Sequence, residues 1–394
     1  MEKRIWLSLA HMSGHELDFI IEAFNTNWVV PLGPNVDAFE VDLENFQKAD
    51  RHVVALNSGT SALHLGLILL GVKPDDEVIC QSFTFAASAN PIAYVGAKPV
   101  FIDSEKDTWN MDPVLLEIAI KDRLEKTGKL AKAIIPVHLY GMPAKMKEIN
   151  AIADKYKIPV LEDSAEALGS KLCNQMCGTF GELAALSFNG NKMITTSGGG
   201  ALVCRNEEEA KLARFYATQA RDIAPYYQHS HIGYNYRMSN ICAGIGRGQM
   251  LVLQDHIDRR RAIHKLYTQL LSNVKGISIM QNPSSEWNSN FWLTCILIDP
   301  NVAGVSRETV RLRLDVANIE TRMLWKPMHL QPVFENYPYY GNGICEYLFE
   351  RGLCLPSGPT LTNDDIFRVV DNIKKMCKKA KRITTVQPYK MVAG

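Results

Sequence analysis

Two residues, a lysine and an aspartate, have the types and the setting that covalent cofactor chemistry needs. Asp163 ends an apolar run typical of a buried strand, and Lys192 lies 29 residues later in the small-residue loop SFNGNKMITTSGGG. A lysine beside the edge of a sheet can be partly desolvated, which leaves its amine free for Schiff-base chemistry. A pyridoxal site needs such a lysine and an acidic partner for the pyridinium nitrogen. An ordinary surface lysine is the commoner alternative, and these two residues alone leave both interpretations open.

A second candidate site follows the first predicted strand, residues 52–56. The segment NSGTSALHL opens a helix there and offers hydroxyl groups, backbone N–H groups and the positive end of the helix. Such a helix start suits a phosphate group, although Ser and Thr also favour any ordinary helix N-terminus. The GxxxxGK[ST] pattern of P-loops is missing. No GxGxxG follows the first strand, so a nicotinamide-binding Rossmann fold loses its main support.

Alternating strand and helix patterns place these residues at one edge of a sheet. We expect strands at 52–56, 77–81, 99–103, 133–137 and 159–162, and helices at 59–70, 85–95, 113–126 and 144–156. Strands that alternate with helices predict βαβ units and a mostly parallel sheet, hence an α/β fold. Ligands bind beyond the carboxyl ends of such strands, which is where the polar and aromatic residues of this chain gather.

The pattern changes after Asp163 and again near residue 275. We expect strands at 183–188, 198–204, 277–280 and 291–298, and helices at 207–217, 239–270, 307–316, 344–351 and 364–379. We interpret residues 1–274 as a large domain and residues 275–394 as a smaller C-terminal α/β domain. Residues 1–45, with helices near 15–25 and 36–48, are expected to pack against the small domain or against a partner.

Composition and charge exclude several classes of protein. The 394 residues include 43 Lys and Arg against 42 Asp and Glu, so no basic excess favours nucleic-acid binding. No apolar stretch approaches the roughly 20 residues that cross a bilayer, and we predict no signal peptide. The nine cysteines form no CxxC pair, which favours free thiols in a reducing cytoplasm. We predict no metal site; His229 and His231 lie in a segment typical of an exposed loop.

Several motifs in order identify a family resemblance. The segments NSGTSAL, SFTF, EDSAEALGS, LSFNGNKMITTSGGG, GYNYRMSN and LWKPMH resemble those of the DegT-like (DegT/DnrJ/StrS) sugar aminotransferases. The similarity runs from about residue 6 to about residue 380. It implies pyridoxal 5'-phosphate as cofactor and the aspartate-aminotransferase fold, known as PLP fold type I. Because NGNK is followed by ITTSGGG, the chain looks closest to transaminases that make 4-amino sugars of the UDP-N-acetylbacillosamine type.

The resemblance also implies a role for each residue of the cofactor site. Lys192 would form the Schiff base, Asp163 would pair with the pyridinium nitrogen, and Glu166 would lie near the phenolic oxygen. Phe85 would stack on the pyridine ring, unless it only packs on its helix. The phosphate would be held by Ser58, Gly59, Thr60 and Ser187, and by Asn235 of the other subunit. Because a carboxylate repels a phenolate, either a donor intervenes between the two groups or the pair shares a proton.

The implied reaction moves the amino group of L-glutamate to C4 of a nucleotide-linked 4-keto-6-deoxy sugar, which we expect to be UDP-2-acetamido-4-keto-2,6-dideoxyhexose. The substrate-facing residues would be Asn27, Trp28, Val29, Val30, Trp325, Lys326, Met328 and His329, with core packing as the alternative for Trp325. A homodimer with shared active sites is expected. The alternatives are a sugar acceptor linked to dTDP or GDP, and a sugar dehydratase, which carries His in place of the Schiff-base lysine. A regulator with a DNA-binding domain is disfavoured because the resemblance covers nearly the whole chain.

Overall fold

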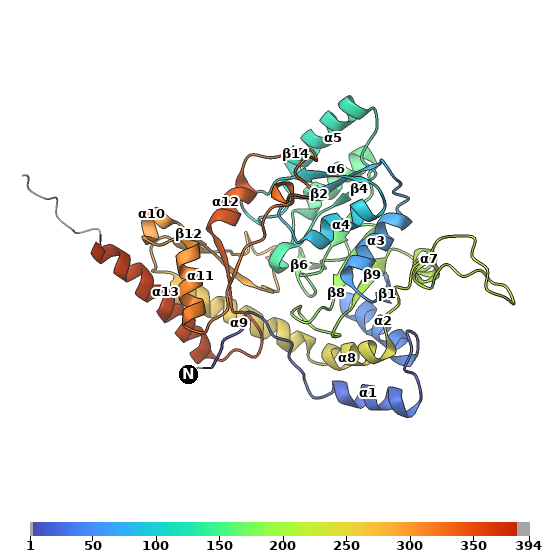
Figure 1. The fold of residues 1–394 in the computed structure, drawn as a ribbon, viewed down its shortest axis with the longest axis horizontal. Coiled ribbons are helices and arrows are strands. Elements are labelled where there is room, and N and C mark those ends of the chain that lie inside the picture. Colours follow the sequence, from blue (N-terminus) through green and yellow to red (C-terminus); the bar gives the residue numbers. More distant parts are fainter. Residues whose placement is uncertain (1–2, 384–394) are drawn as a thin grey trace, which may run out of the picture.

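A central sheet carries the large domain of the computed structural model, which describes residues 3–383 (Figure 1). Its strands are β1 (His52–Leu56), β2 (Glu77–Gln81), β3 (Lys98–Ile102), β4 (Ala133–Ile135), β5 (Leu161–Asp163), β8 (Leu183–Ser187), β9 (Gly200–Cys204) and β14 (Tyr339–Tyr340). They lie in the orders β14-β3-β2-β4 and β5-β8-β9-β1. Parallel bridges, among them Val137 with Asp163, join β4 to β5. Only β9 runs antiparallel to its neighbours, so the sheet is mostly parallel, as the sequence predicts.

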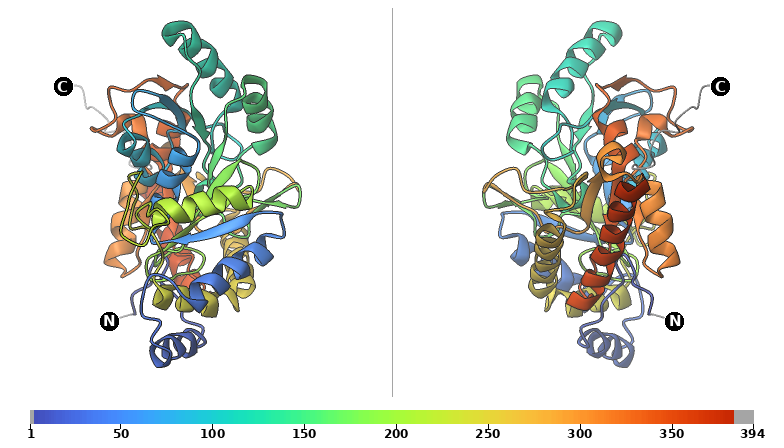
Figure 2. Two further views of the ribbon diagram at one scale, coloured as in Figure 1. Left: turned by 90° about the vertical axis from the view of Figure 1, so that its right-hand side faces the viewer. Right: turned by 90° about the vertical axis from the view of Figure 1, so that its left-hand side faces the viewer.

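Helices cover both faces of this sheet (Figure 2). They are α3 (Gly59–Leu69), α4 (Ala86–Tyr94), α5 (Pro113–Thr127), α6 (Met146–Tyr156) and α7 (Glu207–Ala217). One core forms between the sheet and α3, α4 and α7, and a second forms between β2, β3, β4 and the helices α5 and α6. Strands buried on both faces account for the continuous apolar runs of the sequence. Side chains of Ser58, Asp112 and Asn206 cap three of the helices, each cap being worth about 1 kcal/mol.

The N-terminal helices α1 (Glu16–Asn25) and α2 (Pro34–Gln47) pack on α8 (Asn240–Met250) in the large domain. A side chain at Gly248 would come within 2.7 Å of the Glu16 backbone, so this contact requires glycine. The first residues of the chain do reach the small domain, because Ile5 N–H donates to the Asn318 carbonyl at 3.0 Å. The expected helix 239–270 divides at Leu251 and Val252, and its second part is α9 (Leu253–Leu271).

The small domain contains an antiparallel sheet in the order β10-β12-β15-β13. Its elements are β10 (Ile277–Ile279), β12 (Thr294–Ile298), β13 (Arg322–Met323), β15 (Gly352–Leu355), α10 (Pro300–Ala303), α11 (Arg307–Val316), α12 (Ile344–Arg351) and α13 (Asn363–Ile383). Its core also includes Ile263, Tyr267 and Leu271 of α9, a helix placed in the large domain by the sequence division at residue 275.

Two segments after residue 275 return to the large domain. Strand β14 pairs in parallel with β3 at the edge of the central sheet. Strand β11 (Trp287–Asn288) pairs with β6 (Lys171–Leu172), which continues to β7 (Gln175–Met176). The 3-10 turns η1 (Leu139–Gly141) and η2 (Met328–Leu330) complete the elements used below. Most expected bounds agree with the structure to within two residues, whereas the strand expected from Phe291 begins at Thr294; residues 384–394 of the expected small domain lie outside the described part.

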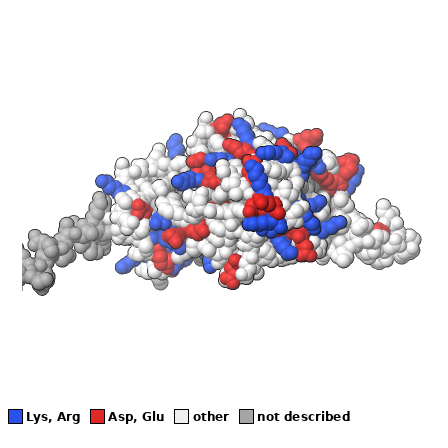
Figure 3. All heavy atoms as spheres, turned by 90° about the horizontal axis from the view of Figure 1, so that it is seen from above, with Lys and Arg blue, Asp and Glu red and all other residues white. Residues whose placement is uncertain are grey.

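The surface carries charges of both signs. On the face in Figure 3, Lys and Arg lie among Asp and Glu, in keeping with the near-zero net charge. Within residues 3–383, no helix is long and apolar enough to cross a membrane.

Candidate active site

A cavity of about 320 Å³ opens beyond the carboxyl ends of β1, β5 and β8. Nine residues that the sequence singles out line it: Ser58, Gly59, Thr60, Phe85, Asp163, Glu166, Ser187, Lys192 and Trp325. Its lining also includes Thr84, Asn189 and Asn191, which stand in the quoted motifs without an assigned role, and Trp292, which stands in none of them. The fold therefore brings together short segments that lie more than a hundred residues apart in the sequence.

Lys192 points into this cavity from the loop between β8 and β9. Its side chain is 13% exposed, and its Nζ atom lies 3.3 Å from Glu166 Oε1. The same Nζ lies 4.3 Å from the centre of the Trp292 ring, a favourable cation–π contact. Backbone bonds from Lys192 N–H to Asn189 O (2.9 Å) and from Thr196 N–H to Phe188 O (2.9 Å) shape the loop. The lysine is thus held inside the site rather than on the surface.

Asp163 lies at the end of β5 with its carboxylate fixed by two donors. Ser88 Oγ donates to Oδ2 at 2.6 Å, and Ala165 N–H donates to Oδ1 at 3.1 Å. Thr84 Oγ1 lies 2.7 Å from Ser88 Oγ and accompanies it in the interior. Ser88 lies in the first turn of α4, and Thr84 lies in the loop just before this helix. They hold the carboxylate in one orientation, as a partner for a cationic ring nitrogen requires.

Glu166 is buried between Lys192 and the turn η1. Its Oε2 accepts the backbone N–H of Tyr140 at 2.6 Å. Tyr140 adopts a left-handed conformation (φ 55°), which non-glycine residues rarely use, and this conformation belongs to the turn that presents the N–H. Burial raises the pKa of Glu166, and the Lys192 ammonium opposes that shift. The backbone N–H of Tyr140 and the Nζ group of Lys192 are thus both donors to this carboxylate.

The start of α3 forms a cradle for an anion. Ser58 Oγ accepts the N–H of Ser61 at 3.0 Å, and the first N–H groups of the helix have no intrahelical acceptor. A Cβ at Gly59 would lie 3.0 Å from the Ser187 Cβ and 3.2 Å from the Leu186 carbonyl, so glycine permits this close approach to β8. Hydroxyl groups, unpaired helix N–H groups and the positive helix end fit a phosphate group.

The predicted substrate residues near 325–329 divide into three environments. Trp325 lines the cavity, and its ring lies 5.2 Å from that of the half-exposed Phe85. Lys326 is exposed, whereas Met328 is buried in the core against α3 and the sheet. His329 lies outside the cavity lining, with Nδ1 2.7 Å from Ser82 Oγ and Nε2 3.0 Å from Glu346.

His329 also belongs to a cluster that its spacing in the sequence did not reveal. Its ring stacks on Tyr339 with centroids 3.6 Å apart. The ligand atoms of His329, Cys345 and Glu346 lie within 4.8 Å of one another, close enough to hold a metal ion. In this structure they bond to each other instead, with Cys345 Sγ donating to Glu346 at 3.2 Å.

The remaining predicted residues, Asn27 to Val30 and Asn235, lie outside this cavity. All of them are exposed in the single chain. Backbone carbonyls of Trp28 and Val30 accept hydrogen bonds from Asn240 at the start of α8. Asn235 lies near the end of the connection between α7 and α8, which Figure 1 shows as an extended loop, and its carbonyl accepts Asn57 Nδ2 at 3.2 Å. One chain therefore does not bring these residues to Lys192.

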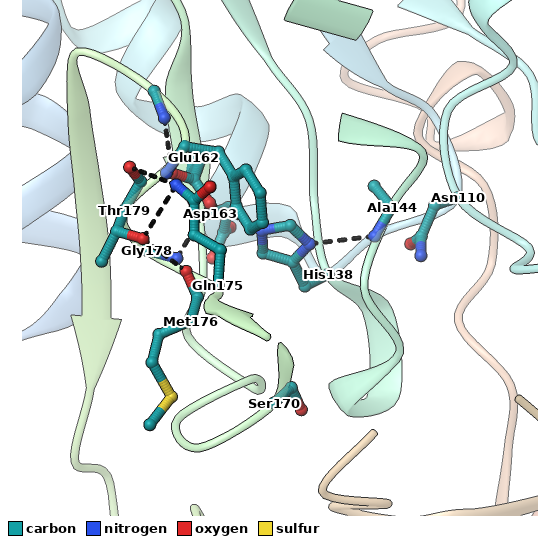
Figure 4. A network of polar contacts seen from close by, with 12 residues as sticks. Asn110, His138, Ala144, Glu162, Asp163, Ser170, Gln175, Met176, Gly178 and Thr179 are labelled. Atoms are coloured by element: carbon teal, nitrogen blue, oxygen red, sulfur yellow. Dashed lines mark hydrogen bonds and ion pairs between the residues drawn. The ribbon is translucent and has the colours of Figure 1, made fainter. Parts of the chain in front are cut away.

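A buried network behind the site holds the end of β5 in place (Figure 4). Glu162 accepts backbone N–H groups of Gly178 (2.8 Å), Phe180 (2.5 Å) and Gly181 (2.6 Å), and pairs with His138 Nε2 at 2.8 Å. Ala144 N–H donates to His138 Nδ1, so Nε2 carries the proton that faces Glu162. This fully bonded carboxylate anchors the strand end that presents Asp163.

Comparisons with known proteins agree with this geometry. Residues 11–374 match the model of the DegT/DnrJ/EryC1/StrS aminotransferase family. EpsN of Bacillus subtilis, named as a pyridoxal phosphate-dependent aminotransferase, is 48% identical over 94% of this chain and 95% of that protein. GDP-perosamine synthase of Escherichia coli O157:H7 is 35% identical over 92% and 96%.

Solved structures give the same result. A DegT DnrJ EryC1 StrS aminotransferase from Brucella abortus superposes with a TM-score of 0.85 at 31% identity, over 92% of this chain and 95% of that one. A sugar aminotransferase from Streptococcus pneumoniae in its pyridoxal phosphate form superposes with a TM-score of 0.87 at 25% identity, over 96% and 100%. Because the family model covers residues 11–374 and relatives more than 30% identical align over nearly the whole chain, the chain belongs to the pyridoxal phosphate-dependent DegT/DnrJ/EryC1/StrS aminotransferase family.

Proposed function

We propose that this aminotransferase moves the amino group of L-glutamate to C4 of a nucleotide-linked 4-keto-6-deoxy sugar. The observation that carries the proposal is the convergence of Lys192, Asp163 and Glu166 in one cavity with the anion cradle of α3. The similarity to GDP-perosamine synthases and to a UDP-4-amino-4-deoxy-L-arabinose–oxoglutarate aminotransferase supports a nucleotide sugar as acceptor.

The residues of the cavity fit pyridoxal phosphate. Ser58, Gly59, Thr60 and Ser187 would hold its phosphate, Phe85 would cover its ring, and Asp163 would face the ring nitrogen. When bound, the cofactor supplies an electron sink for the bond that is broken. The carboxylate of Asp163 holds a proton at that nitrogen, because it is buried and oriented by Ser88.

Lys192 is the proton carrier of the proposed reaction. Once its amine is free, it can take a proton from one atom of the bound substrate and return it to another, a general base and acid in turn. Glu166 Oε1, 3.3 Å away, orients the Nζ group. Because a lysine stands at this position, transamination is favoured over the dehydratase alternative.

For the acceptor we favour UDP-2-acetamido-4-keto-2,6-dideoxyhexose, with a GDP-linked sugar as the second candidate. The ITTSGGG ending of the lysine loop supports the first. Similarity to GDP-perosamine synthases from several organisms supports the second. Trp325 lines the cavity and offers a flat apolar surface for either sugar.

We propose further that two copies of the chain form a homodimer with shared sites. Asn235 would reach the phosphate of the partner's site, and Asn27, Trp28, Val29 and Val30 would face the partner's substrate. The exposure of Trp28, Val29 and Val30, at 38%, 46% and 41%, supports a covering partner. A twofold dimer is also the commonest closed assembly.

The chemistry is tested by borohydride reduction of the pyridoxal phosphate-loaded protein. We expect the cofactor to be fixed to the peptide that contains Lys192, and Lys192→Ala to abolish both labelling and turnover. The matched control is Lys171→Ala in strand β6, outside the cavity lining, which should keep both labelling and turnover. Labelling of a different lysine would contradict the proposed role.

The acceptor is tested by the release of 2-oxoglutarate from L-glutamate with 4-keto sugars linked to UDP, GDP or dTDP. We expect parallel lines in double-reciprocal plots, because both substrates use one cofactor site in turn. A higher kcat/KM for the GDP sugar would select the second candidate, and activity with none of the three would reject the proposed substrate class.

A further inference from the structure

Arg260 of α9 carries a positive charge in the interior directly behind the catalytic loop. It is 1% exposed. Burial lowers the pKa of Arg260 to about 9, so the group is still cationic at neutral pH. Its neighbours Arg259 and Arg261 are partly exposed. A buried cation destabilises a protein unless it is fully paired. The buried position of Arg260 therefore suggests a role beyond packing.

The partners of the guanidinium are neutral oxygen atoms. Nη1 donates to the carbonyls of Trp292 (2.6 Å) and Ser357 (3.1 Å). Nη2 donates to Ser8 Oγ (3.0 Å) and to the carbonyl of Lys192 (3.3 Å). Among the described residues, none of its hydrogen bonds goes to a carboxylate. Hydrophobic packing of α9 alone would not need a charge there, since Ile257 and Ile263 on the same helix serve that purpose.

Two of these carbonyls belong to residues whose side chains meet in the cavity. Lys192 Nζ lies over the Trp292 ring at 4.3 Å. The Trp292 indole in turn donates to the carbonyl of Asn191, the residue before the lysine, at 2.7 Å. One planar guanidinium thus joins the backbones of the lysine and of the aromatic residue beside it. Its fixed fork of donors suits several carbonyls at once, which a lysine ammonium on a flexible stem does not reproduce.

We propose that Arg260 is a positioning residue that fixes the backbone of Lys192, and so the reach of its Nζ atom into the cofactor site. This inference rests on the Schiff-base role of Lys192 proposed above. In that step the free amine adds to the aldehyde carbon, a C=N bond forms, and the aldehyde oxygen leaves as water. The rate of this step depends on the position of Nζ. The noncovalent affinity of the site for the cofactor's phosphate and ring does not depend on that position.

Two ligands separate positioning from general support of the fold. Pyridoxal 5'-phosphate must react with Lys192, whereas pyridoxamine 5'-phosphate has no aldehyde and binds without the covalent bond. We compare the apoprotein with Arg260→Met, Arg260→Lys and the control Arg259→Met. Stopped-flow absorbance measures the rate of Schiff-base formation, and fluorescence titration measures the Kd of pyridoxamine phosphate.

For Arg260→Met we expect Schiff-base formation to slow about tenfold or more, since small misplacements of a reacting group have such effects. The Kd of pyridoxamine phosphate is expected to stay unchanged. Arg260→Lys should give an intermediate rate, and Arg259→Met the wild-type rate. Equal loss in rate and in pyridoxamine phosphate affinity, or a wild-type rate in Arg260→Met, would overturn the proposal.

If Arg260→Met does not fold, Arg260→Lys decides, and a wild-type rate in that variant overturns the proposal. Failure of the proposed function has a different signature. In that case the wild-type protein itself is not labelled at Lys192 by borohydride, whatever the arginine variants do.

Discussion

The cofactor half and the substrate half of the site differ in how complete they are within one chain. In the cofactor half, Asp163, Glu166 and Lys192 are largely buried, and each has hydrogen-bonding partners within 3.5 Å. In the proposed substrate half, Trp28, Val29 and Val30 are exposed, and Asn235, which is proposed to reach the partner's phosphate, also lies outside the cavity lining. A preorganised cofactor half holds its charges without rearrangement during the reaction. In the proposed homodimer, a second copy of the chain would cover the exposed half.

Removal of the negative charge from the cofactor half should have the largest effect. Asp163→Asn keeps the shape of the side chain but cannot hold the proton at the ring nitrogen. We expect kcat to fall about a hundredfold or more, which corresponds to roughly 3 kcal/mol of barrier. Steady-state kinetics with L-glutamate measures the loss. If the variant retained the wild-type kcat, the negative charge of Asp163 would not be needed for the reaction.

The division between the halves is tested most directly by hybrid dimers. Lys192→Ala and Asn235→Ala subunits should each be nearly inactive alone. Random mixing gives one intact site in half of the dimers, so about a quarter of the wild-type activity should return. Refolding of the mixture, followed by separation on different affinity tags, provides confirmed hybrids. If these hybrids stay inactive, Asn235 does not act across an interface.

The sequence predicts the residues of the proposed cofactor half better than the residues that pack around them. Lys192, Asp163 and the segment from Ser58 to Thr60 stand in continuous motifs, and each follows or precedes a predicted strand. Trp292 has no such signal, because it approaches Lys192 from a segment 100 residues further along the chain. Met328 illustrates the reverse case, since it stands in the same motif as Trp325, which lines the cavity, while its own side chain is buried in the core.

The domain division shows a similar limit. Strand patterns locate two strands of the small sheet, β10 and β12, but not β13 or β15, and local patterns carry no information about pairing partners. They therefore do not reveal that β14 joins β3 or that half of α9 belongs to the small core. Ser88 falls between these cases: it stands in the helix that follows the SFTF motif, but no sequence pattern shows that its hydroxyl group contacts Asp163.

Ser88 offers a smaller test of the cofactor half. Ser88→Ala removes one of the two donors to Asp163 while the carboxylate stays in place. We expect kcat to fall about tenfold, or roughly 1.4 kcal/mol, which is less than for Asp163→Asn. Ser88→Thr keeps the hydroxyl group and should recover part of the loss. The double variant with Asp163→Asn should be no worse than Asp163→Asn alone, because Ser88 acts through that carboxylate; additive losses would contradict this dependence.

The smallest effect on activity is expected at Glu16, at the start of α1, which anchors the proposed substrate half. Its Oε1 accepts Ser13 N–H at 2.8 Å and Gln249 Nε2 of α8 at 2.6 Å. Burial alone would raise the pKa of Glu16, but these hydrogen bonds lower it to about 2. Because the folded pKa lies below the unfolded one, the ionised carboxylate stabilises the protein above about pH 4.5, and this stabilisation is lost as the pH falls toward 2.

Glu16→Gln should therefore lower the free energy of unfolding at pH 7 by about 1–3 kcal/mol. The difference from wild type should shrink as the pH falls below 4.5, since the wild-type carboxylate then begins to lose its advantage over the unfolded state. Urea unfolding at pH 7 and pH 4 measures both values. Glu22→Gln, on the exposed side of the same helix, is the control and should leave stability unchanged. Since α1 leads directly to Asn27 and Trp28, the variant should also raise KM for the sugar more than it lowers kcat; an unchanged KM would mean that α1 does not position the substrate half.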